Sequence, residues 1–217
     1  MKPDHTLYGI IGPDHVRGRD MVAMAEAGAR GGMTLLQYRD KHSDTRTLVE
    51  NARLLKAALA PFSVPLLIND RVDVALAAGA DGVHLGQSDM APVDARRLLG
   101  PDAIIGWTLK NTAHAEALRH QPVDYATIGG VFATTSKDNP DPPVALDGFQ
   151  AILKIARSSK TIPIGAIAGI TPENAPAVMK AGAAGIAVIG AIFMADSPEQ
   201  AARDLRGIVE ANRSAAT

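Results

Sequence analysis

Short apolar runs alternate with helical stretches along the whole chain, and this alternation constrains the fold most. Eight runs have β-strand character, at residues 7–12, 34–39, 65–69, 82–86, 103–108, 125–130, 162–167 and 185–190. An amphipathic or Ala-rich stretch follows each run, at about 19–31, 45–60, 71–78, 92–99, 112–119, 147–158, 172–181 and 198–212. Such units predict parallel strands joined by right-handed crossovers. Eight of them close naturally, so we expect an α/β fold that is a single (β/α)8 TIM barrel.

An open doubly wound sheet is the competing architecture. It usually carries a glycine-rich fingerprint after its first strand, but the stretch GIIGPDH at residues 9–15 lacks the GxGxxG pattern. The spacing of the units stays even, and no linker interrupts it. We therefore expect residues 1–217 to form one domain.

Composition excludes several classes of protein. Hydrophobic residues make up 47% of the chain, enough for a sizeable core. The net charge of -1 offers no basic excess for nucleic acid or an anionic membrane. The absence of cysteine rules out a disulfide, a thiolate nucleophile and a cysteine-ligated zinc site. The longest apolar run, GIAVIGAIFMA, is shorter than the roughly 20 residues that span a bilayer, so we expect a soluble cytoplasmic protein.

Two successive strands in the stretch 65–90 run directly into acidic residues. Asp70 follows the third apolar run, and Asp89 follows the fourth. Neighbouring parallel strands lie roughly 4.8 Å apart, so both carboxylates could converge on one cation such as Mg²⁺. Each acid could instead be the N-cap of the next helix, with Ser88 as an alternative cap in the second case. The sequence leaves both interpretations open.

The second strand ends in QYRDK, and the alternation of side chains puts Gln37, Arg39 and Lys41 on one face. Polar donors at the end of a buried strand need an anionic partner, which a phosphate or diphosphate would supply. Ion pairs of Arg39 with Asp40 and neighbouring acids are the alternative.

Strand five and the loop after strand six supply further polar groups. By alternation, Thr108 and Trp107 face opposite ways, so if Thr108 points into the site, Trp107 packs against the helices. A lone mid-strand histidine, His84, is more often packed and hydrogen-bonded than catalytic. Thr134, Thr135, Ser136 and Lys137 resemble an anion cradle, or else a solvated turn.

Strands seven and eight end in AIAGITPEN and VIGAIF. Gly169 allows close approach of backbone to a ligand, Thr171 can cap a helix that starts at Pro172, and Gly190 opens another helix. The standard barrel phosphate site lies in these two loops. The sequence therefore predicts two anion sites, and two phosphorylated substrates would fit them.

The chain resembles the thiamine-phosphate synthase family over nearly its whole length. The resemblance is carried, in order, by QYRDK, INDRVDVALAAGADGVHLGQSD, GWTLKN, DYATIGGVFATTSK, AIAGITPEN and GIAVIGAIF. It implies a TIM-barrel transferase that joins hydroxymethylpyrimidine diphosphate to a thiazole phosphate, plain or carboxylated, and releases pyrophosphate. It also implies a dissociative, Mg²⁺-assisted mechanism without a protein nucleophile, and suggests a possible homodimer.

The resemblance assigns residues to three groups. Arg39, Thr108 and Lys137 would take part in catalysis. Asp70 and Asp89 would be the Mg²⁺ ligands. The substrate-binding positions would be Gln37, Arg39, Lys41, Asn69, Thr108 and Lys137 on the pyrimidine diphosphate side, and Thr134, Thr135, Ser136, Gly169, Ile189 and Gly190 on the thiazole phosphate side.

Three positions depart from the pattern of that family. Thr108 stands where serine is usual, Lys110 where histidine is frequent, and Gly190 where serine is usual. Two rival functions remain. A thiazole tautomerase-like isomerase typically has a histidine where this chain has Gly130, and tends to lack the second acid, Asp89. A non-catalytic phosphate-binding regulator would not require both metal acids.

Overall fold

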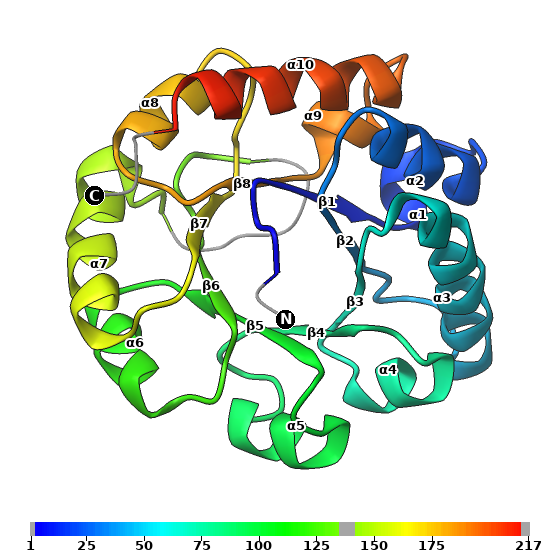
Figure 1. The fold of residues 1–217 in the computed structure, drawn as a ribbon, viewed down its shortest axis with the longest axis horizontal. Helices are drawn as coiled ribbons and strands as arrows, with labels where there is room; N and C mark the ends of the chain where they lie inside the picture. Colours follow the sequence, from blue (N-terminus) through cyan, green and yellow to red (C-terminus); the bar gives the residue numbers. More distant parts are fainter. Residues whose placement is uncertain (1–2, 135–141, 214–217) are drawn as a thin grey trace.

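A closed barrel of eight parallel strands forms the centre of the molecule. The computed structural model describes residues 3–134 and 142–213. Each strand pairs with the next, and the eighth pairs with the first (Figure 1). The strands are β1 Leu7–Ile11, β2 Leu35–Tyr38, β3 Leu66–Asn69, β4 Gly82–Leu85, β5 Ile104–Leu109, β6 Tyr125–Ile128, β7 Ile164–Ile167 and β8 Ile186–Val188. The predicted TIM barrel is therefore confirmed, and the open sheet is excluded.

A ring of helices surrounds the barrel (Figure 1). The helices predicted between strands are α2 Met21–Arg30, α3 Thr45–Leu59, α4 Val72–Ala78, α5 Pro92–Leu99, α6 Thr112–Ala117, α7 Ala145–Ser159, α8 Ala175–Lys180 and α10 Pro198–Ala211. Single turns α1 Pro13–Val16 and α9 Gly190–Phe193, with the 3₁₀ turns η1 Ala60–Phe62 and η2 Leu118–His120, complete the described helical elements. The second of these single turns begins at Gly190, where the sequence predicts a helix start.

The two faces of each strand pack into different cores. Outward side chains, Trp107 among them, form the large core between barrel and helices. The barrel interior is filled by Tyr8, Ile10, Leu35, Leu67, Ile104, Tyr125, Ile167, Ala187 and Ile189. Trp107 thus packs against the helices, as its place in the alternation predicts.

Helix α8 begins later than predicted. Its first residue is Ala175 rather than Pro172, and Thr171 is not its cap. Asn174 accounts for the difference, because its side chain accepts the Thr171 N–H at 2.9 Å and donates to the Gly169 carbonyl at 2.9 Å. These bonds hold residues 171–174 in a turn outside the helix.

The N-terminal segment crosses one mouth of the barrel before β1 begins (Figure 1). His5 in this segment is 2% exposed, and its ring lies 4.8 Å from that of Tyr125. The opposite mouth, at the carboxyl ends of the strands, is left for a site. Across the described ranges, no helix is long and apolar enough to cross a membrane.

Candidate functional site

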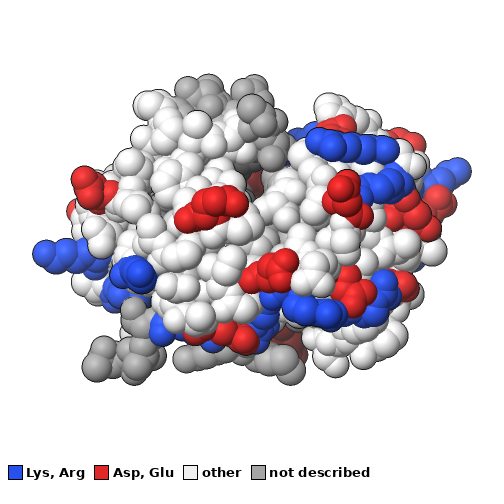
Figure 2. Space-filling view, turned by 90° about the horizontal axis from the view of Figure 1, so that it is seen from above, with Lys and Arg blue, Asp and Glu red and all other residues white. Residues whose placement is uncertain are grey.

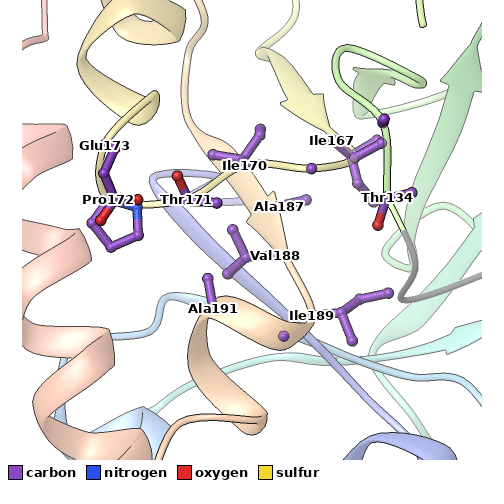
Figure 3. Close-up of a pocket in the computed structure, with 14 residues that line it drawn as sticks. Thr134, Ile167, Ile170, Thr171, Pro172, Glu173, Ala187, Val188, Ile189 and Ala191 are labelled. Atoms are coloured by element: carbon purple, nitrogen blue, oxygen red, sulfur yellow. The ribbon is translucent and has the colours of Figure 1, made fainter.

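Two adjacent pockets open at the carboxyl ends of the strands. The first, which we call the polar pocket, has a volume of about 200 Å³. The second, the loop pocket, has a volume of about 600 Å³ and lies in the loops after β6, β7 and β8 (Figure 3). The polar pocket is lined by Tyr8, Ile10, Gln37, Arg39, Lys41, Asn69, Asp70, His84, Gly86, Gln87, Ser88, Asp89, Thr108, Lys110, Ile167 and Ile189.

Asp70 and Asp89 meet in the polar pocket, and neither caps a helix. Helix α4 starts after Arg71 and α5 after Ala91, and neither helix has a side-chain cap hydrogen bond. Asp89 instead accepts the N–H of Gly86 at 2.6 Å, which closes its own loop. The N-cap interpretation of both acids, and of Ser88, is therefore wrong.

The two carboxylates form an acidic pair that suits a divalent cation. Burial, followed by the hydrogen-bonding neighbour Asp70, raises the pKa of Asp89 above its usual range. Asp70 also has a left-handed backbone conformation, with φ of 61°, which is strained for a residue with a side chain. Mg²⁺ typically binds one or two carboxylates and completes its shell with water and phosphate oxygens, so this pair fits Mg²⁺.

The two cationic side chains that follow β2, Arg39 and Lys41, line the same pocket as the acidic pair. Lys41 donates from Nζ to Asp70 Oδ2 at 2.7 Å. No carboxylate pairs with Arg39 in the parts of the chain that the structure describes. Asp40, the expected partner, accepts from Tyr38 Oη at 3.0 Å and from the His42 N–H at 2.9 Å. The ion-pair alternative for Arg39 and Asp40 is thus wrong.

Thr108 and Asn69 complete the wall of the polar pocket on β5 and β3. The Thr108 hydroxyl lies 2.8 Å from His84 Nε2, and the methyl group lies over Gly129. The carbonyl of Thr108 accepts from Gln87 Nε2 at 2.6 Å. The hydroxyl of this residue therefore has a defined direction, with the additional methyl turned toward β6.

Backbone geometry shapes the loop pocket. Ala168 and Gly169 have φ values of 91° and 63°, so the chain turns sharply after β7. A Cβ at Gly169 would collide with the Ala133 carbonyl and lie 2.7 Å from Phe132 Cβ. Glycine at position 169 therefore permits close contact of the two loops. Thr134, Gly169, Ile189 and Gly190 all line the pocket, and Thr134 and Ile189 are labelled in Figure 3.

Ile167 and Ile189 line both pockets. Both side chains are mostly buried, with exposed fractions of 8% and 7%. They form an apolar wall along which the polar pocket and the loop pocket adjoin. Molecules bound in the two pockets would meet at this wall. Thr135, Ser136 and Lys137, which the sequence also singles out, lie outside the described residues.

Sequence reasoning missed several residues of the polar pocket as participants. Tyr8 and Gln87 line it, and so do Lys110, named above only as a departure from the family pattern, and His84, which is packed and hydrogen-bonded as predicted. Strand alternation alone could have pointed to Tyr8 and His84, because both occupy inward positions. Gln87 lies in a loop, and no periodicity predicts where a loop side chain points.

Comparisons with known proteins agree on one family. The family described as thiamine monophosphate synthase matches residues 7–192. A thiamine-phosphate synthase of Agrobacterium fabrum is 49% identical over 211 residues, covering 97% of this chain and 96% of that protein. A thiamine-phosphate synthase of Chloroflexus aurantiacus is 44% identical, covering 98% of this chain and 96% of that protein.

Solved structures agree with the sequences. A thiamine phosphate pyrophosphorylase from Pyrococcus furiosus superimposes with a TM-score of 0.84 at 33% identity, covering 97% of this chain and 98% of that chain. A 3-hexulose-6-phosphate synthase superimposes with a TM-score of 0.65 at 19% identity, covering 94% of this chain and 99% of that chain. The second similarity shows the barrel fold alone.

Proposed function

The chain belongs to the thiamine monophosphate synthase family and catalyses the condensation that forms thiamine phosphate, and we propose how its two pockets carry it out. The substrates are hydroxymethylpyrimidine diphosphate and a thiazole phosphate, and the second product is pyrophosphate. The observation that carries the proposal is the apolar wall of Ile167 and Ile189, which borders both pockets. The pyrimidine diphosphate would occupy the polar pocket, and the thiazole phosphate the loop pocket.

The polar pocket would hold the leaving group. Arg39 and Lys41 supply positive charge for the diphosphate, and Gln37 and Asn69 supply amide hydrogen bonds. Asp70 and Asp89 would hold Mg²⁺, which supplies charge stabilisation of the departing pyrophosphate when it is bound. On diphosphate binding we expect Lys41 to exchange its ion pair with Asp70 for a phosphate oxygen.

The loop pocket would hold the thiazole phosphate through backbone and hydroxyl groups. Thr134 offers a hydroxyl, and Gly169 and Gly190 offer backbone that a ligand can approach closely. Helix α9 is one turn long, so its macrodipole is small. The phosphate would therefore bind directly to the first backbone N–H groups of α9. From the sequence resemblance alone, we propose that Thr135 and Ser136 also bind the thiazole phosphate. From the same resemblance, we propose that Lys137 contacts the diphosphate during catalysis.

The reaction would be dissociative. The C–O bond to the diphosphate breaks first, and the thiazole nitrogen then forms the new C–N bond to the pyrimidine methylene carbon. Arg39 and Lys41 stabilise the charge that develops on the leaving group. The wall of Ile167 and Ile189 would exclude water from the cationic carbon. The hydroxyl oxygen of Thr108, which His84 holds in place, would face that carbon.

The two rival functions are less well supported. Gly130, where a thiazole tautomerase-like isomerase would typically have histidine, has φ of 73° in a loop turn. A phosphate-binding regulator would need neither Asp89 nor Asp70. We further propose that residues 1–217 act as one catalytic domain without a nucleic-acid partner. A homodimer stays a prediction that sedimentation velocity tests.

Pyrophosphate release tests the proposal directly. We expect purified protein to release pyrophosphate with Mg²⁺ and both substrates, and to release far less with either substrate alone. Chelation of Mg²⁺ with EDTA should stop the release, and added Mg²⁺ should restore it. Folded protein that releases no pyrophosphate from the complete mixture would contradict the proposed function.

A further inference from the structure

A chain of polar side chains crosses the inside of the barrel, where branched apolar residues usually fill the layers. Tyr8 and Tyr125 are both 0% exposed, and His84 is 7% exposed. Burial raises the pKa of each phenol, so both keep their protons at neutral pH. Two phenols and an imidazole in this layer need hydrogen-bond partners.

The partners are one another and two further residues that, like Tyr8 and His84, line the polar pocket. Gln37 on β2 donates from Nε2 to the hydroxyl of Tyr8 on β1. The hydroxyls of Tyr8 and Tyr125 are 3.0 Å apart. His84 Nδ1 lies 2.8 Å from the Tyr125 hydroxyl, and His84 Nε2 lies 2.8 Å from Thr108 Oγ1. The result is one continuous chain from Gln37 to Thr108, which we call the interior chain.

The fold makes room for this arrangement. A Cβ at Gly106 on β5 would overlap the phenol of Tyr125, including its hydroxyl oxygen. The ring therefore passes across Gly106 to reach His84. The methyl group of Thr108 lies against Gly129, which leaves its hydroxyl directed at His84.

Stability alone does not require the interior chain. Apolar side chains at positions 8, 37, 84 and 125 together would fill the same layer, and replacing both partners of a buried hydrogen bond by apolar groups is often nearly neutral. The two ends of the chain, Gln37 and Thr108, line the pocket assigned to the pyrimidine diphosphate. A buried chain of fully paired groups restricts rotation at both ends.

We propose that Tyr8, Tyr125 and His84 are positioning residues that hold the Gln37 amide and the Thr108 hydroxyl in fixed orientations against the reacting pyrimidine, an inference that rests on the proposed function. His84 fixes the torsion of the Thr108 hydroxyl, and Tyr8 fixes which end of the Gln37 amide faces the pocket. Neither tyrosine needs to react. Loss of this preorganisation slows the chemical step more than it weakens binding.

The substitution Tyr125→Phe tests the proposal, because it keeps the ring over Gly106 and removes the hydroxyl. We expect kcat to fall by about 10- to 100-fold with KM for both substrates changed less than about twofold. Thr127→Val is the matched control. Thr127 occupies the next inward position of β6, its buried hydroxyl lies 3.4 Å from His5 Nε2, and it is outside the interior chain. Its kcat should stay within about twofold of the unsubstituted protein.

A double-mutant cycle separates positioning from a general structural effect. Thr108→Val removes the hydroxyl on which Tyr125 acts through His84, so Tyr125→Phe should cost little more in that background. Wild-type kcat in Tyr125→Phe, a loss confined to KM, or losses that multiply in the double variant would each overturn the proposal. If Tyr125→Phe does not fold, Tyr8→Phe carries the same test in a cycle with Gln37→Ala. Unsubstituted protein that releases no pyrophosphate in this assay would refute the proposed function instead.

Discussion

Asp89 lies within hydrogen-bonding reach of Asp70, and the two carboxylates repel each other when both are ionised. The Lys41 ion pair with Asp70 and the Gly86 N–H that Asp89 accepts only partly offset this cost, because the pKa of Asp89 stays raised by burial and by Asp70. Arg39 similarly has no carboxylate partner among the described residues, although it lines a pocket. Groups that oppose stability at one point of the fold are expected where function needs them.

The variant Asp89→Asn should separate these effects. Burial and Asp70 raise the folded-state pKa of Asp89 above the ordinary 3.8, so the stability linked to this group is present below that value and lost as pH rises through the raised pKa. Without Mg²⁺, the asparagine variant should have a higher melting temperature than the unsubstituted protein at about pH 7. At about pH 3 the two melting temperatures should be equal. Activity with Mg²⁺ should fall on the order of 100-fold or more. Differential scanning fluorimetry and the pyrophosphate assay measure the two quantities.

Asp20 provides the control, because it is a true N-cap. Its side chain accepts the N–H groups of Val22 at 2.9 Å and Ala23 at 3.2 Å at the start of α2. Asp20→Ala should lose about 1 kcal/mol of stability and keep its activity. Full activity of Asp89→Asn, or a loss of stability like that of Asp20→Ala, would argue against the metal role.

Whole elements are positioned by contacts that close the ends of the barrel. The N-terminal segment places His5 inside the mouth opposite the two pockets, with its ring 5.3 Å from that of Tyr8. Gly165 makes room for this ring, because a Cβ there would overlap it. His5 Nδ1 is buried and has no hydrogen-bond partner among the described residues. The segment therefore carries a neutral, buried imidazole.

Acid should open this end of the barrel. Burial lowers the pKa of His5 from 6.5 to about 4. Its contribution to stability is therefore complete above pH 6.5 and is lost as pH falls toward about 4. The loss over that range amounts to roughly 3 kcal/mol. Urea unfolding should give a smaller free energy of unfolding at about pH 4.5 than at about pH 7, where the contribution of His5 is complete. The variant His5→Gln should show a smaller difference between the two pH values.

His42→Gln is the matched control for that experiment. The His42 side chain is 76% exposed and lies outside the barrel interior. This variant should keep the full pH dependence of the free energy of unfolding. The same decline in His5→Gln as in the unsubstituted protein would show that another group carries the acid sensitivity.

The molecule as a whole brings two pockets to one end of the barrel. Strands β1 to β5 contribute to the polar pocket, and the loops after β6, β7 and β8 form most of the loop pocket. Figure 2 looks onto the side formed by α8 and α10, where positive and negative side chains are mixed. This face therefore presents no single-sign patch.

The shared apolar wall should determine how well bond cleavage is coupled to condensation. Ile167→Ala widens the passage beside the cationic carbon and lets water compete with the thiazole nitrogen. We expect the ratio of pyrophosphate released to thiamine phosphate formed to rise above about one, the stoichiometry of tight coupling. Chromatographic quantification of both products measures this ratio.

Ile170→Ala is the control, because Ile170 lines the loop pocket but not the polar pocket. It should raise KM for the thiazole phosphate and leave the product ratio unchanged. An unchanged ratio in Ile167→Ala would show that this side chain does not exclude water during the reaction.

The sequence by itself determined the strand–helix alternation, the inward or outward direction of strand residues, and the position of polar groups at strand ends. These features follow from local periodicity and from the fixed direction of parallel strands. The tertiary structure alone decided that Asp70 and Asp89 meet rather than cap helices, and that α8 starts at Ala175. It also decided the interior chain from Gln37 to Thr108. Loop direction and side-chain pairing depend on contacts between residues far apart in the sequence, and no local pattern encodes those contacts.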